Sequence, residues 1–336
     1  MAELNTASLR DFVKNATVIW VREADSLPEA MRNSGIYKVD SWDSGTGDTR
    51  EYSEIDVEEY AHNKSESAPG DVALVQQGYT KTVSPKRRGL EISISWEMRR
   101  RNKYRETVDK LTSLARHVPN RRELDLTHRF TFGTATTYAD MDGQTINIST
   151  GDTLQLFYAT HTLAGSSTQY RNRLANNPQL SKGALEAMEK LIVEQTYNQL
   201  GQKKVMSFDI LWTTDDPNTV NTARELLQST AEISAPNSGV KNVYMGKYKH
   251  VILPRLATTA VGAPDSTKAK YWGIASSSAS SAFLAIEEDN VLTAPTPNSN
   301  GEDFSTDDWR FKCRGSYGIV IVGAAWVKMS SGDGVA

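Results

Sequence analysis

Two neighbouring segments of this chain carry large and opposite charges, and this division constrains the fold more than the overall composition does. Residues 40–71 contain ten acidic and two basic side chains, a net charge of −8. Residues 81–122 contain thirteen basic and four acidic side chains, a net charge of +9. The simplest interpretation is two solvated faces. A sharper one is that the two surfaces meet, either within one chain or between copies of it.

The whole chain has 336 residues, enough for one elaborate domain or two ordinary ones with a sizeable core. Its formal net charge of −3 argues against a protein whose main task is to grip phosphates. Cys313 is the only cysteine, which excludes an internal disulfide and favours a reducing compartment. No apolar run approaches the roughly 20 residues that a membrane span needs, and no secretion signal is evident. We therefore expect a soluble protein made inside the cell, with no membrane partner.

The first 40 residues are expected to form an arm. Ser8–Asp11 fits a capping box, and apolar residues follow it at helical spacing, at Leu9, Phe12, Val13 and Ala16. The β-branched run 17–21 then predicts a short strand. A short isolated helix is marginal in water, so this arm should pack on another part of a protein.

Residues 41–98 are expected to form a long hairpin. The segments 50–60 and 72–83 supply its legs, and Pro69-Gly70 marks a turn in the polar tip. Residues 90–96 then alternate cleanly between apolar and polar, as in a half-buried strand. A hairpin this polar has too little apolar surface to be stable alone, so it needs a surface to pack against.

A helix is predicted after the hairpin. Apolar residues between Tyr104 and Val118 recur at steps of three and four, over about 22 Å of helix. Pro119 is expected to end or kink this helix, because proline lacks the amide N–H that a helix interior requires.

Capping and turn signals outline a second compact unit. Asp142-Gly143 predicts a tight turn between extended segments. Ser181 and Asp216 each precede a helical pattern as capping residues, and Pro217 occupies a first-turn position. The succession of strand, helix and strand predicts a small mixed sheet covered by helices. The nearly continuous apolar run Tyr317–Val322 suits a central strand.

No motif for chemistry stands out. None of the five histidines has the spacing of a zinc site, and Asp140 and Asp142 lack the glutamate of a calcium loop. The stretch WDSGTGD (Trp42–Asp48) resembles one loop of an aspartic protease, but such an enzyme needs two. Neither a phosphate-binding loop nor a nucleophile elbow is present. We therefore predict no catalytic, cofactor-binding or metal-binding residues, and no enzyme.

Five cations gather at the start of the basic segment, in the stretch SWEMRRRNKYRE: Arg99, Arg100, Arg101, Lys103 and Arg105. They could neutralise phosphates, so a nucleic-acid-binding protein that uses the basic helix 99–122 is an alternative function. No DNA-reading motif or aromatic stacking array accompanies them. A charged face with an acidic partner nearby explains both charge blocks together and is the favoured interpretation.

The succession of these parts resembles the major capsid proteins of tailed bacteriophages. The segment GDTLQLFYATHTLAGSSTQYRNRLANNPQLSKGALEAMEKL (151–191) is similar to the entry into the second domain of Mu-type major head subunits. Residues 203–229, then GKYKHVILPRL and YWGIAS, resemble the strands and helix that follow in that family. Residues 303–329 resemble its closing strands. The polar stretch 136–150 departs from the family pattern, and the short segment before residue 41 leads us to expect no fused assembly-guiding segment.

The resemblance implies an α+β chain with the HK97-like capsid fold. Its parts would be an N-terminal arm (1–40), an extended β-hairpin or E-loop (41–98), a peripheral domain with a long spine helix (99–180), an axial domain of mixed sheet and helices (181–295), and C-terminal strands that return to the peripheral domain, with a tail (296–336).

The same resemblance implies a structural function. The chain would assemble as hexamers and pentamers into an icosahedral phage shell around double-stranded DNA, which is held without sequence readout. Expected partners are other copies, a separate scaffolding protein, a portal protein at one vertex and, in some relatives, a decoration protein. The protein would reside in the virion after assembly in the host bacterial cytoplasm. The hairpin of one copy would cover its neighbour, which places the five cations listed above against Glu54, Asp56, Glu58 and Glu59.

Overall fold

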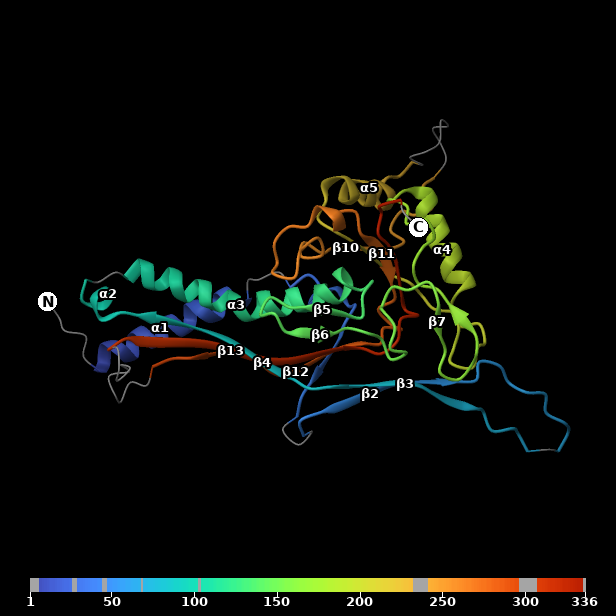
Figure 1. The fold of residues 1–336 in the computed structure, drawn as a ribbon, viewed down its shortest axis with the longest axis horizontal. Coiled ribbons are helices and arrows are strands. Elements are labelled where there is room, and N and C mark those ends of the chain that lie inside the picture. Colours follow the sequence, from blue (N-terminus) through green and yellow to red (C-terminus); the bar gives the residue numbers. More distant parts are fainter. Residues whose placement is uncertain are drawn as a thin grey trace.

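The computed structural model describes residues 6–25, 29–43, 47–67, 69–101, 104–231, 241–295 and 307–334, with the side chains of residues 6–12, 25, 99, 104 and 105 outside that description. The chain is elongated, and two sheets lie at different places along it (Figure 1). Its helices are α1 (Thr6–Asp25), α2 (Trp96–Arg100), α3 (Tyr104–Thr131), α4 (Lys182–Glu194) and α5 (Pro217–Gln228), with 3-10 turns η1 (Arg32–Ser34) and η2 (Ser266–Lys268).

A first sheet has the strand order β1 (Lys38–Ser41), β12 (Ala282–Thr293), β13 (Trp309–Ile321) and β4 (Lys86–Ile94). The long strand β13 lies between β12 and β4, so the central position predicted from the apolar run Tyr317–Val322 is confirmed. It is antiparallel to both neighbours. Helix α3 packs on this sheet through Leu111, Leu114 and Val118, against Phe311 of β13. Sheet, α1 and α3 together are called the first unit below.

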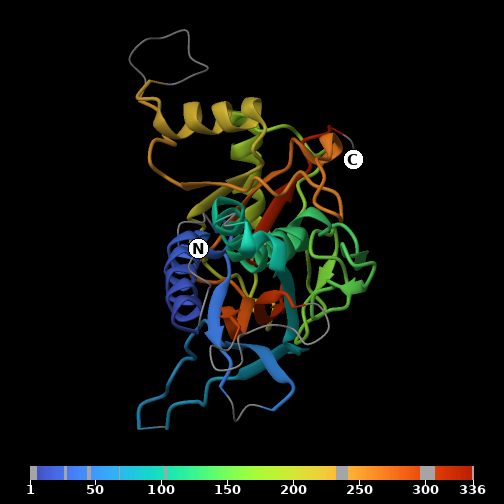
Figure 2. The ribbon, with the colours of Figure 1, turned by 90° about the vertical axis from the view of Figure 1, so that its left-hand side faces the viewer.

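Helix α1 corrects the predicted strand at 17–21. It continues to Asp25 and lies beside α3 (Figure 2). Ala16 and Trp20, one helical turn apart, are buried, while Val18 and Val21 are exposed. Burial of one helix face against α3 therefore overrides the β-branched preference of the run, because local propensity is weaker than tertiary packing. The capping box at Ser8–Asp11 lies outside the described side chains.

Helix α3 continues past Pro119 to Thr131, so of the end or kink predicted there the helix does not end. Proline at 119 removes the N–H that would bond the carbonyl of Ala115. In this structure Asn290 of β12 supplies the missing donor, since its Nδ2 donates to that carbonyl at 2.9 Å. A side chain from the first sheet thus completes the helix.

Replacing Asn290 with alanine should therefore lower the free energy of unfolding by about 1–2 kcal/mol, because a half-buried carbonyl loses its donor. The measurement is urea unfolding followed by circular dichroism. In a Pro119→Ala background the same replacement should cost clearly less, since residue 119 then offers its own N–H. Equal costs in both backgrounds would show that the bond does not compensate for the proline.

A second sheet has the order β10 (Lys249–Ile252), β9 (Ile210–Thr213), β11 (Trp272–Ala275) and β14 (Val327–Ser330). It is mixed, because β10 is parallel and β11 antiparallel to β9, as predicted. Ser181 and Asp216 cap α4 and α5 by accepting bonds from the backbone N–H groups of Ala184 and Thr219, both as expected. This sheet and these helices form the second unit.

The sheets cut across the predicted ranges 181–295 and 296–336. Strand β12 lies in the first sheet, although its residues fall in the range assigned to the axial domain. Strand β14 lies in the second sheet beside β11, although the C-terminal strands were expected to return to the peripheral domain. One apolar core joins the two units, with Phe130, Trp212 and Trp326 in contact at its centre. The chain therefore crosses between the units more than once.

The predicted hairpin is present as β2 (Arg50–Val57) paired antiparallel with β3 (Val75–Val83). It projects from the end of the body that is remote from α2 (Figure 1). Shorter hairpins are β5 (Thr137–Ala139) with β6 (Thr145–Asn147), around the predicted turn at Gly143, and β7 (His161–Thr162) with β8 (Gln169–Tyr170). The α+β class and the predicted order of arm, hairpin, long helix and mixed unit are confirmed.

Candidate functional site

The base of the β2–β3 hairpin is bonded to a loop of the second unit in the same chain. Gln199 Nε2 donates to Glu54 Oε2 and the Gln199 backbone N–H donates to Asp56 Oδ2, each at 3.0 Å. Lys204 Nζ also donates to Asp56. Burial raises the pKa of Glu54. Three of the four acidic residues predicted to face a neighbour, Glu54, Asp56 and Glu58, are therefore engaged within their own chain.

Close packing at two glycines, as well as hydrogen bonding, fixes the contact between the hairpin and the second unit. A Cβ atom on Gly78 of β3 would lie 3.0 Å from both Gln199 and Glu54, and one on Gly165 would lie 2.4 Å from Gln76. Glycine at these positions lets the hairpin backbone lie close against the second unit. The hairpin is thus held in one direction at its base.

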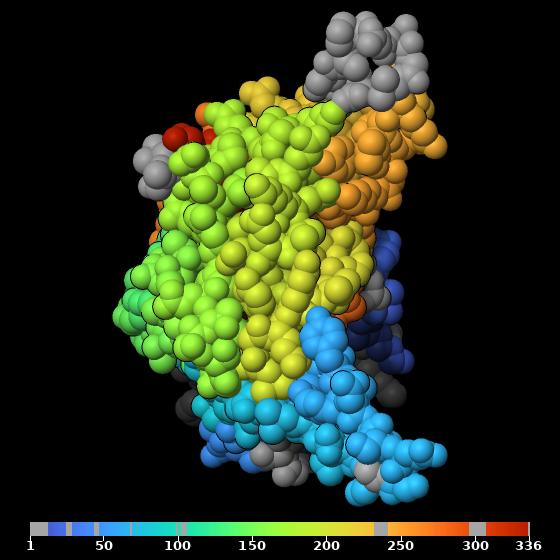
Figure 3. Space-filling view, turned by 90° about the vertical axis from the view of Figure 1, so that its right-hand side faces the viewer, coloured from blue at the N-terminus to red at the C-terminus, as the bar shows by residue number. Residues whose placement is uncertain are grey.

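The hairpin tip, residues 58–74, extends beyond this contact and away from the body (Figure 3). Apart from Ser67, which has a positive φ of 62°, its described backbone is unremarkable, and Tyr60 and Val72 are 62% and 94% exposed. His62 Nε2 lies 3.1 Å from Glu58 Oε1, and bonds from His62 and the Leu74 N–H lower the pKa of Glu58. The tip therefore offers exposed apolar side chains beside the exposed Glu59, while the side chain of Glu58 is only 15% exposed.

The predicted cations lie at the opposite end of the molecule, around α2. Arg100 lies over the ring of Trp96, with its guanidinium carbon 4.9 Å from the ring centre, and Arg101 is exposed. The side chains of Arg99 and Arg105, and all of Lys103, lie outside the described residues. Figure 1 shows α2 and the hairpin tip at the two ends of the long axis. A single chain therefore does not bring the two predicted sets of charges together.

Much of the remaining basic segment is neutralised inside the first unit, which the sequence did not reveal. Arg121 bonds the carboxylates of Asp125, Asp140 and Asp142 at 3.0, 2.9 and 3.1 Å. Arg122, only 2% exposed, pairs with Glu29 and Asp289. Most of these partners are far away in sequence, so no local pattern could have identified the network.

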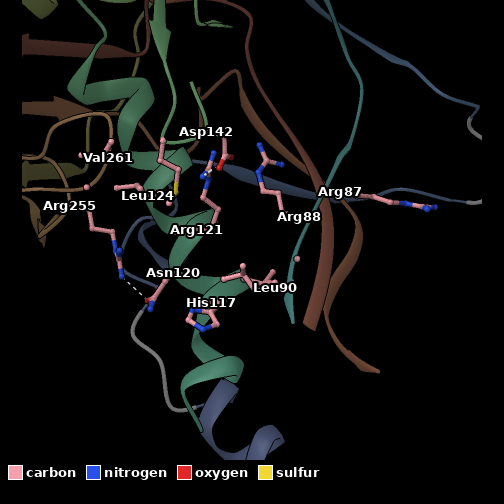
Figure 4. A pocket seen from close by; sticks show the side chains of 14 residues that line it. Arg87, Arg88, Leu90, His117, Asn120, Arg121, Leu124, Asp142, Arg255 and Val261 are labelled. Atoms are coloured by element: carbon pink, nitrogen blue, oxygen red, sulfur yellow. Dashed lines mark hydrogen bonds and ion pairs between the residues drawn. The ribbon is translucent and has the colours of Figure 1, made fainter. Parts of the chain in front are cut away.

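Between these ends, β4 and α3 of the first unit and the loop after β10 line a pocket of about 510 Å³ (Figure 4). Arg87 and Arg255 line it together with His117, and exposed Leu90 and Val261 contribute apolar surface. Figure 4 shows Arg255 turned toward Asn120, to whose Oδ1 it donates at 2.7 Å. Burial lowers the pKa of His117. A cationic pocket with apolar walls suits an acidic, partly apolar chain segment better than a bare phosphate.

Among the residues that the structure describes, no three His, Cys, Asp or Glu side chains are grouped so that they could hold a metal ion. Within the same residues, no helix has the length and apolar character of a membrane span. A second histidine and carboxylate, His161 and Asp152, are bonded at 2.6 Å, and both side chains are buried. His161 stacks on Tyr170, and Asp152 also accepts from the Thr150 hydroxyl and the Leu154 N–H, so the pair ties down the loop before β7.

An elongated body, a projecting hairpin and separated charged surfaces describe a protein that functions by contacting other chains. The chain belongs to a phage capsid protein family: the model of a family described as "Phage capsid protein" matches residues 78–329, well over half of the chain. The resemblance drawn from the sequence is thereby confirmed at the level of the family, and the chain is a structural capsid component rather than an enzyme. No curated protein is significantly similar to it in sequence.

Three solved structures with a similar fold are distant in sequence. A virus-like particle from Pyrococcus furiosus shares 10% identity at a TM-score of 0.48, over 95% of this chain and 99% of that chain. The capsid of Myoviridae phage XM1 shares 11% identity at a TM-score of 0.46, over 88% and 90%. The capsid of an empty GTA particle shares 10% identity at a TM-score of 0.46, over 90% of each chain.

Proposed function

We propose that the chain is the shell-forming subunit of a phage head, which assembles as hexamers and pentamers into an icosahedral shell around double-stranded DNA. The observation that carries the proposal is the hairpin, which is held at its base and has a tip that its own chain leaves uncovered. In this proposal residues 1–40 are the arm, 41–98 the extended hairpin, 99–180 the peripheral domain, 181–295 the axial domain and 296–336 the C-terminal strands and tail, except that β12 joins the first sheet and β14 the second.

The contact between copies follows from the distribution of charge. Glu58 and Glu59 at the tip would face Arg100 and Arg101 of a neighbouring copy, together with Arg99, Lys103 and Arg105. Glu54 and Asp56 serve differently, because their bonds to the second unit aim the hairpin before a neighbour is present. Complementary charge of this kind sets register and partner choice more than raw affinity. The pocket that contains Arg87 and Arg255 offers a second cationic surface, between the first unit and the loop after β10.

Reversing the charge of Arg100 and Arg101 to glutamate should abolish shell formation while the chain stays folded. Like charges would then oppose each other across the contact, and α2 is exposed enough to tolerate the change. The measurement is electron microscopy and sedimentation of the purified protein, with circular dichroism to verify folding. Regular shells, tubes or rings are expected from the wild type under the same conditions.

Two further variants sharpen this test. Adding Glu58→Lys and Glu59→Lys to the reversed chain should restore assembly, since opposite charges face each other again. Lys190→Glu, at a side chain of α4 that is 75% exposed, changes charge remote from α2 and should leave assembly intact. Normal shells from the Arg100→Glu, Arg101→Glu chain would contradict the proposed contact, although not the capsid function.

The nucleic-acid alternative retains the cations around α2, but Arg116, Arg121 and Arg122 of the basic helix are paired with carboxylates of the same chain. DNA inside the shell would be confined without sequence readout. A scaffolding protein, a portal protein at one vertex and, outside the shell, a decoration protein would be the other partners, in a virion assembled in the bacterial cytoplasm. A folded monomer with steep, salt-dependent DNA affinity would favour the alternative instead.

A further inference from the structure

A second pocket, of about 370 Å³, lies where the hairpin base meets the first unit. Its walls come from the connection between β3 and β4, from α3, from the turn between β5 and β6, and from β13. Lys86 and Arg129 line it, together with Ser84, Thr82 and Asn147. Nothing in the contact between copies proposed above uses these residues.

Arg129 is incompletely satisfied in this pocket. Its Nη1 donates to the carbonyl of Asn147 at 2.9 Å, but its Nε is buried and has no hydrogen-bond partner. Among the residues that the structure describes, no carboxylate forms an ion pair with it. A buried N–H of a charged group without an acceptor is costly, so native proteins rarely leave one unless a water or ion completes it.

A second cation lies beside Arg129. Lys81 of β3 donates from Nζ to the carbonyl of Ser149, two residues from the carbonyl that Arg129 holds. Burial, and then the charge of Arg129, lower the pKa of Lys81 to about 8. Lys81 and Arg129 thus both bond carbonyls of the loop 147–149. Asp152, the carboxylate whose charge acts on Lys81, is bonded to His161 instead.

The carboxylates in the pocket wall are also occupied. Asp125 accepts from Arg88 and Arg121, each at 3.0 Å, and from the hydroxyl of Tyr317 at 2.9 Å. Asp140 accepts from Arg121 at 2.9 Å and from backbone N–H groups of its own turn. Neither carboxylate is bonded to Arg129, so the positive charge on this side of the pocket has no partner of opposite sign in direct contact.

We infer that this pocket binds a phosphate-class oxyanion between Arg129 and Lys86, with the hydroxyls of Thr82 and Ser84 as further donors. A guanidinium matches two oxygens of such an anion at once, and an ammonium group and hydroxyls add donors from other directions. The anion would give the Arg129 Nε its acceptor and would relieve the repulsion between Arg129 and Lys81. Because its donors come from both α3 and the strand connection at the hairpin base, it would fasten the hairpin to the first unit.

The test is isothermal titration of the full chain with sodium phosphate at constant ionic strength, with sodium chloride as the comparison. Wild-type protein should bind one phosphate per chain with a saturable signal, and chloride should give none. Arg129→Gln should weaken binding at least tenfold, and Lys86→Gln, an exposed lining residue, several-fold. Arg224→Gln, which removes an exposed charge on α5, should bind phosphate like the wild type.

Three results would overturn the inference: no saturable phosphate signal from the wild type, an equal signal from chloride, or unchanged phosphate affinity in the folded Arg129→Gln chain. If Arg129→Gln fails to fold, Lys86→Gln decides. A several-fold loss of affinity in that variant supports the site, and unchanged affinity refutes it. Shell formation plays no part in this measurement, so its outcome is separate from that of the proposed function.

Discussion

Replacing Arg122 with methionine is expected to lower the free energy of unfolding by about 3 kcal/mol, because the change removes one partner of a buried charge network. Arg122 lies within α3 and is 2% exposed. It donates to Glu29, in the segment after α1, and to Asp289, in β12. The one side chain therefore fastens the arm, the long helix and the first sheet to one another.

Arg32, the other cation of this network, would not compensate for the loss of Arg122. Arg32 already bonds Glu29 at 2.7 Å and Asp289 at 3.2 Å, and it is more exposed than Arg122. Burial alone would raise the pKa of Asp289, but the charges and hydrogen bonds of Arg122 and Arg32 outweigh it and the pKa is lowered. Stability from this carboxylate is present above its unfolded pKa of about 4 and is lost as the pH falls through its folded pKa. The penalty of Arg122→Met should accordingly narrow in acid.

Urea unfolding at pH 7 and at pH 3 measures both effects. The matched control is Arg314→Met, which removes an arginine that is 51% exposed and bonds Glu288 at 2.7 Å. An exposed pair of this kind contributes less than about 1 kcal/mol, so the control should lie close to the wild type. Equal penalties for the two variants would mean that the Arg122 network contributes no more than a surface ion pair.

Local signals in the sequence account for much of the fold. The alternation in residues 90–96 predicts β4, the Ser181 and Asp216 caps predict the starts of α4 and α5, and the apolar run near Tyr317 predicts a central strand. Each of these features depends on residues within a few positions of one another. Such patterns remain informative whatever the rest of the chain does.

The misses share a physical cause, which is a partner far away in the chain. The run 17–21 is helical because α3 covers Ala16 and Trp20, and α3 passes Pro119 because Asn290 donates to Ala115. Neither partner can be identified from local pattern. The same reason explains why the crossing of β12 and β14 between the two units was not predicted.

The candidate surfaces also combine features that the local sequence predicts with contacts that it does not predict. Counting charges correctly identifies an acidic hairpin and a basic segment, but it cannot say which charges are already paired. Glu54 and Asp56 look like Glu59 in the sequence, yet the side chains of the first two are bonded to Gln199, whereas Glu59 is exposed. Contacts with Gln199 and Lys204 hold the side chains of Glu54 and Asp56. No local sequence pattern marks Gln199 or Lys204 as their partners.

Lys328 provides the last large effect, a dependence of stability on alkaline pH. The side chain lies in β14 and is 0% exposed. Its Nζ donates to the carbonyls of Arg171 and Gln195 at 3.1 and 3.2 Å, and burial lowers its pKa to about 7. The unfolded chain has an ordinary lysine pKa of about 10.4, so between these values it binds a proton that the folded chain releases. The free energy of unfolding contributed by this lysine therefore rises with pH across that window.

Comparison with Lys328→Met isolates this titration from those of the buried tyrosines, which are common to both chains. The difference in unfolding free energy, wild type minus variant, should rise by about 2.5 kcal/mol from pH 8 to pH 10, close to 1.4 kcal/mol per pH unit. Loss of the two bonds to carbonyls changes this free-energy difference by the same amount at every pH. The slope of the difference against pH, rather than its absolute value, therefore reports the titration of Lys328. A difference that stays flat over this range would mean that Lys328 keeps its proton in the folded chain, stabilised by the two carbonyls and by the ring of Tyr170, 5.5 Å away.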